Sequence, residues 1–182
     1  SFSLESRKAV ENARIQLAKL LGANNLNEIV FTSGGTESDN WAILGALEEN
    51  PEKKHIITTR VEHEAVRKLC EKLERKGFHI TWLEVDEEGF LNLDELKGHL
   101  RKDTAIVSIM LANNETGVLF PVEKIAEIVK ENSDALFHVD GVNAVGKIPV
   151  NLKNTAIDMF SVSGHKFHAP KGIGALYINE KI

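Results

Sequence analysis

The residues with the clearest chemical potential lie at positions 163–172, which read Ser-Gly-His-Lys-Phe-His-Ala-Pro-Lys-Gly. Lys166 follows the predicted buried strand 157–162, so it stands at the mouth of that strand. Burial disfavours an ammonium ion and lowers its pKa, and the neutral amine attacks carbonyl carbons. One such carbonyl is the aldehyde of pyridoxal 5′-phosphate (PLP), which a lysine holds as a Schiff base. A solvated surface lysine is the alternative, and this stretch alone leaves both interpretations open.

Asp140 and His63 offer two further groups for such chemistry. Asp140 ends a predicted strand, where a carboxylate can pair with a protonated pyridine nitrogen and make the ring a better electron sink. His63 opens a predicted helix, where its ring can stack on a flat ligand or shuttle protons. The plainer alternatives are a turn aspartate and a helix-start histidine.

A metal centre is not expected. His138, His165 and His168, together with Asp140, are candidate metal ligands by residue type, but no His-x-x-x-His or Cys-x-x-Cys spacing accompanies them.

Residues 33–37, Ser-Gly-Gly-Thr-Glu, join a predicted strand to a predicted helix. Glycines let the backbone approach a ligand, and the N–H groups of a helix start favour an anion such as phosphate. The alternative is a tight turn with Ser33 or Thr36 as the helix N-cap. The Gly-x-Gly-x-x-Gly and Gly-x-x-x-x-Gly-Lys-Ser/Thr patterns are absent, which argues against dinucleotide and nucleoside triphosphate binding.

The elements that must position these residues alternate along the chain. Helices are predicted over residues 6–21, 36–48, 64–76, 93–100 and 122–130, and strands over 28–32, 55–59, 79–85, 104–111, 135–139, 157–162 and 174–178. The strands are continuously apolar, as expected when helices cover both faces of a sheet. The sequence therefore predicts an α/β fold, with a mostly parallel sheet and helices on both faces.

Ligands of such folds bind at the carboxyl ends of the strands. Five polar groups follow predicted strands, namely residues 33–36, 62–63, 113–115, 140–143 and 163–166. We expect them to converge on one edge of the sheet. In the first helix, an apolar face is formed by Val10, Ala13, Leu17, Leu20 and Leu21.

Composition bounds the class of protein. The 182 residues are 42% hydrophobic and 27% charged, which suits one domain with a sizeable core. A net charge of −5 offers no basic surface, so no nucleic-acid partner is expected. The longest apolar run, 105–112, is too short to span a membrane, so no membrane association is expected.

Cys70 is the single cysteine, which excludes an internal disulfide and fits a reducing cytoplasm. It shares a helical stripe with Val66, Leu69 and Leu73, so we expect a core residue rather than a nucleophile. The chain begins with neither a methionine nor a signal peptide, and we interpret it as a fragment.

Together these segments resemble the class V aminotransferase family of fold-type I PLP enzymes, and within it the cysteine desulfurases. The matching segments are Phe-Thr-Ser-Gly-Gly-Thr-Glu-Ser-Asp-Asn (31–40), Val-Glu-His (61–63), Ala-Asn-Asn-Glu-Thr-Gly (112–117), His-Val-Asp (138–140) and Ser-Gly-His-Lys-Phe-His-Ala-Pro-Lys-Gly-Ile-Gly (163–174). They cover essentially the whole chain in the family's order. The nitrogen-fixation branch is the most similar at Thr116, residues 119–121, residues 152–154 and Ala169.

The resemblance implies PLP as the cofactor and a role for each matching residue. Lys166 would form the Schiff base, Asp140 would pair with the pyridine nitrogen, and His63 would stack on the ring and assist proton transfer. The phosphate would be held by Gly35, Thr36, Ser163 and His165. The ring hydroxyl and the substrate carboxylate region would be contacted by Asn114 and Asn143.

Two positions depart from the family's pattern. The family usually has Gln at position 143 and Ala at position 141, where this chain has Asn143 and Gly141. Asn143 is one methylene shorter, so a bridging water would have to complete its hydrogen bond to the ring hydroxyl.

The resemblance also implies that residues 1–182 are the PLP-binding large domain of a longer enzyme, without its N-terminal segment and small C-terminal domain. The intact enzyme would be a cytoplasmic homodimer that converts L-cysteine to L-alanine. It would pass persulfide sulfur to a scaffold or other acceptor protein for iron–sulfur cluster assembly. The nucleophilic cysteine and the substrate-binding arginine would lie outside this chain, so we expect the isolated chain to be inactive. The alternatives are another class V enzyme, such as a selenocysteine lyase or an aminotransferase, and a non-catalytic PLP-binding fragment.

Overall fold

Seven strands form one sheet in the computed structural model, which describes residues 2–182. The strands are β1 (Ile29–Thr32), β2 (His55–Thr59), β3 (His79–Leu83), β4 (Thr104–Met110), β5 (Leu136–Asp140), β6 (Met159–Ser163) and β7 (Gly174–Ile178). Their order is β1-β7-β6-β5-β4-β2-β3. Strands β3, β2, β4, β5 and β6 are parallel, whereas β7 runs antiparallel to both β6 and β1. The prediction of a mostly parallel sheet is confirmed.

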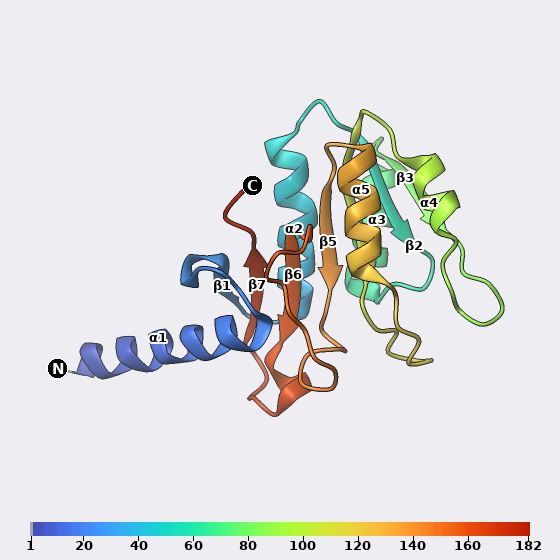
Figure 1. The fold of residues 1–182 in the computed structure, drawn as a ribbon. Helices are drawn as coiled ribbons and strands as arrows, with labels where there is room; N and C mark the ends of the chain where they lie inside the picture. The colour runs from blue at the N-terminus through green and yellow to red at the C-terminus, as the bar shows by residue number, and fades with distance from the viewer. Residues whose placement is uncertain (1) are drawn as a thin grey trace.

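Helices cover both faces of this sheet, also as predicted (Figure 1). They are α1 (Phe2–Leu21), α2 (Gly35–Glu49), α3 (Glu64–Glu74), α4 (Leu93–His99) and α5 (Val122–Asn132), with short 3₁₀ helices η1 (Leu26–Glu28) and η2 (Gly164–Phe167). On one face α2 and α3 pack on the sheet, and on the other face α4, α5 and the end of α1 do so. Every residue of β2, β4 and β6 is buried, which explains why these strands are continuously apolar or uncharged.

Helix α1 differs from its sequence-based description. It projects away from the sheet, with its N-terminal end far from the other elements (Figure 1). Ala18 and Leu21 are buried, but Val10 and Leu20 are each 47% exposed. The predicted apolar face therefore contacts the core only at the C-terminal end of the helix.

Two buried histidines tie neighbouring strands together. The His55 ring of β2 lies between the hydroxyls of Thr81 and Thr104, at 2.8 Å from each. The His138 ring of β5 likewise lies between Ser108 on β4 and Ser161 on β6, at 2.9 and 2.8 Å. Burial lowers the pKa of His138 to about 3 and that of His55 to about 4, so both rings are neutral near pH 7.

Cys70 is fully buried on α3 beside Val66 and Leu73, which confirms its prediction as a core residue. Burial raises the pKa of its thiol to about 12. Among the helices of the described residues, none has both the length and the apolar character needed to cross a bilayer.

Candidate active site

The carboxyl ends of β1, β2, β5 and β6 surround a hollow of about 160 Å³. Its walls are formed by Gly35, Thr36, Asp39, His63, Asp140, Val142, Asn143, Ser163, His165 and Lys166. The structure thus brings together eight of the nine site residues that the sequence predicts. Residues from four segments, separated by up to 131 positions in the chain, meet at one edge of the sheet because the parallel strands end there.

Asn114 is the ninth predicted residue, and it does not line this hollow. It lies exposed in the loop after β4 and lines a neighbouring hollow that shares Asn143. Asn113 shapes this loop, because its Oδ1 accepts hydrogen bonds from the backbone N–H groups of Glu115 and Thr116, both at 2.9 Å. Its amide also donates to the carbonyl of Val61, which ties the loop to the segment before His63.

Asp140 is the last residue of β5 and is only 3% exposed. One of its carboxylate oxygens, Oδ1, accepts a hydrogen bond of 2.9 Å from the backbone N–H of Val142. Burial raises the pKa of Asp140, while the Val142 N–H group, His63 and Lys166 act in the opposite direction. A buried acid facing a polar hollow is suited to bind a cationic ring nitrogen.

Lys166 lies in η2, just beyond the end of β6, and is half-buried rather than fully buried. This position fits the prediction that Lys166 stands at the mouth of a buried strand, because the chain leaves the sheet after Ser163. Lys166 is the one lysine among the described residues that line the hollow. Nearby, the Ser163 hydroxyl lies 3.0 Å from Nδ1 of His165, so these two side chains hold one another at the wall.

Two glycines at the start of α2 let its backbone lie close to neighbouring groups. Its N-cap is Gly34, and no side chain of the described residues caps the helix. The alternative prediction of a Ser33 or Thr36 cap is therefore wrong. A Cβ atom at Gly35 would lie 2.6 Å from Cγ2 of Val142, so glycine allows the helix start to lie against the β5 loop. Uncapped N–H groups at a helix start favour an anion.

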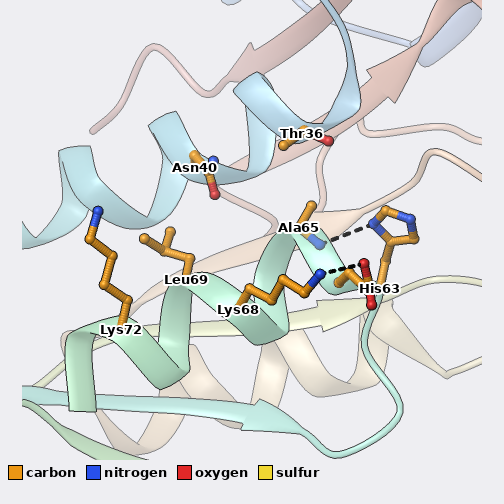
Figure 2. A pocket seen from close by; sticks show the side chains of 8 residues that line it. Thr36, Asn40, His63, Ala65, Lys68, Leu69 and Lys72 are labelled. Carbon is orange, nitrogen blue, oxygen red and sulfur yellow. Dashed lines mark hydrogen bonds and ion pairs between the residues drawn. The ribbon is translucent and has the colours of Figure 1, made fainter. Parts of the chain in front are cut away.

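His63 is a helix-start residue, which is the plainer of its two predicted descriptions. It is the N-cap of α3, and its Nδ1 accepts a hydrogen bond of 3.1 Å from the backbone N–H of Ala65 (Figure 2). A neutral ring with Nδ1 as acceptor carries its proton on Nε2. Figure 2 shows a second hollow between α2 and α3, which His63 and Thr36 also line. In that hollow Nζ of Lys68 lies 2.8 Å from Oε2 of Glu64, so the two side chains form an ion pair.

Asp39 is a lining residue that the sequence analysis missed. It lies one turn after Thr36 on α2 and is 1% exposed. The i, i+3 spacing from Thr36 places both residues on one helix face, and this was the available signal. Within residues 2–182 no group of three or more His, Cys, Asp and Glu side chains is arranged to hold a metal ion.

Comparison with known proteins identifies the family. The family described as aminotransferase class-V matches residues 1–182. The chain belongs to the class V aminotransferase family.

Individual class V relatives are similar over the full length of this chain. A protein of Nostoc sp. named cysteine desulfurase is 57% identical over 182 residues, which are 100% of this chain and 45% of that protein. A solved NifS-like protein has a TM-score of 0.95 and 42% identity, and the match covers 100% of this chain and 50% of that one. The solved structure of SspA in complex with cysteine has a TM-score of 0.92 and 38% identity, over 98% of this chain and 51% of that one. The chain thus spans about half the length of these relatives.

The structure gives a physical reason for glycine at position 141. A Cβ atom at this position would overlap the ring of Phe160 on β6. Phe160 is fully buried and fills the space that the alanine side chain would need. Glycine at position 141 and phenylalanine at position 160 are therefore a matched pair.

Proposed function

We propose that this chain is the PLP-binding large domain, residues 1–182, of a cysteine desulfurase. One observation carries the proposal: a primary amine, a buried carboxyl group and an uncapped helix start line the same hollow. They belong to Lys166, Asp140 and α2. PLP has an aldehyde, a basic ring nitrogen and a phosphate, and each of these groups matches one of the three features.

Each part of the hollow suits one part of the cofactor. Gly35 and Thr36 at the start of α2, with Ser163 and His165 opposite, would hold the phosphate by N–H and O–H donors. Asp140 would hold the ring nitrogen in its protonated form. When bound, PLP supplies an electron sink for the carbon next to the substrate amine.

The chain's own residues would orient and move protons around that carbon. Lys166 presents its Nζ from η2 and would act as a proton donor and acceptor. His63 is held by Ala65 with the proton on Nε2, which orients its ring for stacking and for donating that proton. Asn143 lies between this hollow and the Asn114 loop, where it would contact the ring hydroxyl and the substrate carboxylate region together with Asn114.

The activity of the whole enzyme follows as part of the proposal. The intact protein would convert L-cysteine to L-alanine as a cytoplasmic homodimer and pass persulfide sulfur to an iron–sulfur scaffold or other acceptor protein. The names of the similar proteins, cysteine desulfurase and NifS-like protein, support this reaction and the nitrogen-fixation type. The cysteine bound to SspA supports the choice of substrate.

The test is covalent trapping of PLP. The chain is incubated with PLP, reduced with borohydride, and the modified lysine is mapped by mass spectrometry. We expect the adduct on Lys166 in the wild type and in the matched control Lys171→Ala, and its loss in Lys166→Ala. Lys171 is a suitable control because it is exposed and does not line the hollow. An adduct on another lysine, or one that persists in Lys166→Ala, would contradict the proposal.

A further inference from the structure

Three buried carboxyl groups at the hollow interact electrostatically with one another. They belong to Asp39 on α2, Glu62 after β2 and Asp140 on β5, with exposed fractions of 1%, 6% and 3%. Charge repulsion from Asp140 raises the pKa of both Asp39 and Glu62, and Glu62 also raises that of Asp39. Three interacting negative charges in a buried site would be strongly unfavourable.

Glu62 has an asymmetric environment. Its Oε1 accepts hydrogen bonds from the hydroxyl of Thr59 at 2.8 Å and from the backbone N–H of Met110 at 3.1 Å. Its Oε2 is buried and has no hydrogen-bond partner among the described residues. The carboxyl group thus connects the segment that carries His63 to the end of β4, while one oxygen is left without a donor.

Asp39 is in a similar situation. Its Oδ1 is buried without a hydrogen-bond partner in the described part of the chain and lies 3.6 Å from Nε2 of His138. That ring is neutral, because burial lowers the pKa of His138 to about 3. His138 therefore brings no positive charge to Asp39, although a hydrogen bond with Ser161 partly offsets the burial.

Positive charge reaches only one member of the cluster. The groups that face Glu62 are Thr59, the Met110 N–H, Cys70 and the other two acids, and those that face Asp39 are Ser161, His138 and the other two acids. Of the three acids, Asp140 alone lies near basic side chains that favour its charged form, namely the His63 ring and the Lys166 ammonium. Asp39 and Glu62, which lack such a neighbour, are therefore the two acids for which the protonated form is favoured.

We propose that Glu62 and Asp39 are protonated at neutral pH and act as positioning residues, leaving the single negative charge of the cluster on Asp140 at the hollow. Burial, followed by the charge of Asp140, raises the pKa of Glu62 to about 8 and that of Asp39 well above its ordinary value. A neutral Glu62 holds the His63 segment on β4 without adding a second charge beside Asp140. The link to a ring nitrogen rests on the proposed function, but the protonation itself is a property of the chain without cofactor.

The experiment measures the free energy of unfolding by denaturant from pH 5 to pH 9, without PLP. The variants are Glu62→Gln and Asp39→Asn, which resemble the neutral acids, and the control is Glu84→Gln at an exposed acid paired with Arg60. An acid with a raised pKa in the folded state loses stability as the pH rises through the window between the two values, here about 4.5 to about 8 for Glu62. In that window each pH unit should lower the wild-type folding constant by up to about tenfold relative to Glu62→Gln. Asp39→Asn should shift in the same direction, and Glu84→Gln should run parallel to the wild type.

Infrared spectroscopy gives a readout that does not depend on the variants folding. The wild-type chain is labelled with ¹³C at the glutamate side-chain carboxyl, and the carbonyl band of a protonated glutamate is sought at pH 7. Its presence, and its loss in Glu62→Gln where that variant folds, is the expected result. A missing band, or parallel stability curves for Glu62→Gln and the wild type, would overturn the inference. A chain that shows the band but traps no PLP would leave the inference standing and refute the proposed function.

Discussion

At the scale of single residues, Gly141 and Phe160 show how one buried side chain limits the size of its neighbour. The Phe160 ring occupies the volume next to the backbone that follows Asp140. The core at this point is packed so tightly that it has no space for one more methyl group. The backbone at Gly141 thus has two neighbours to satisfy: it follows the Asp140 carboxyl in the chain, and it lies against the Phe160 ring.

Gly141→Ala is expected to destabilise the chain by about 1–3 kcal/mol, because an added methyl group overpacks a filled core. Equilibrium unfolding in urea measures the change. The double variant Gly141→Ala with Phe160→Leu should lose less stability than the sum of the two single changes, because the smaller side chain makes room. Strict additivity would show that the two residues do not share this space.

Most of the site could be predicted at this scale because of one regularity. Polar residues that directly follow apolar strands, such as Asp140 and Ser163, must lie at the edge where parallel strands end. Asp39 lies within α2 and carries no such signal. Glu62 does follow a strand, but its importance comes from burial, which only the folded chain creates. The exposure of Lys166 was equally unpredictable, because it depends on where β6 ends.

At the scale of elements, α1 shows that a segment can form a helix without burying its apolar side chains. Leu20 and Leu21 are adjacent and chemically identical, yet Leu20 is 47% exposed and Leu21 is 0% exposed. An apolar stripe in the sequence reports the spacing of side chains but not the presence of a surface to cover them. The predicted face of α1 therefore could not reveal that only its last turn meets the core.

Leu21→Ala should cost about 2–5 kcal/mol of unfolding free energy, because it leaves a cavity in the core. Leu20→Ala should change that free energy by at most about 0.5 kcal/mol, as for other exposed positions. Chemical denaturation of the two variants checks this, and each serves as the matched control of the other. Equal losses would mean that Leu20 is buried in solution.

The direction of β7 is a second element-scale feature that the strand pattern does not carry. Apolar runs mark strands but not their polarity. The connection between β6 and β7 covers only residues 164–173 and contains no helix long enough for a parallel crossover. Its shortness therefore imposes the antiparallel pairing.

His138, which bridges three strands, makes the stability of the chain depend on pH. Its pKa is about 3 in the folded chain against an ordinary value of 6.5, so its contribution to stability is present above pH 6.5 and is lost as the pH falls toward 3. The loss should amount to at most about 1.4 kcal/mol per pH unit. Denaturation at several pH values should show the stability gap between the wild type and His138→Asn shrinking as the pH falls. The exposed control His79→Asn should keep a nearly constant gap, and a constant gap for His138→Asn would contradict the assignment.

At the scale of the whole molecule, the chain belongs to the class V aminotransferase family but has no exposed thiol. Cys70 is its single cysteine, and burial raises the pKa of that thiol to about 12. Only the thiolate is an effective nucleophile, so Cys70 is unsuited to accept sulfur.

The isolated 182-residue chain is therefore expected to release no sulfide from cysteine above the background given by free PLP. The measurement is a paired sulfide and alanine assay with PLP and L-cysteine, run beside Cys70→Ser. Turnover that vanishes in Cys70→Ser would refute both the assignment of Cys70 to the core and the need for a cysteine from elsewhere in the protein.

The enclosed position of Cys70 between α3 and the sheet also makes it a built-in probe of motion. An alkylating reagent can reach this sulfur only while α3 transiently separates from β2 and β4. Its labelling rate under native conditions therefore reports how often that part of the chain opens. Since His63 is the N-cap of α3 and lines the hollow, the same rate would register whether a ligand in the hollow slows the opening of this helix. The alkylation rate of this buried, unreactive thiol thus measures the opening rate of the helix beside the site.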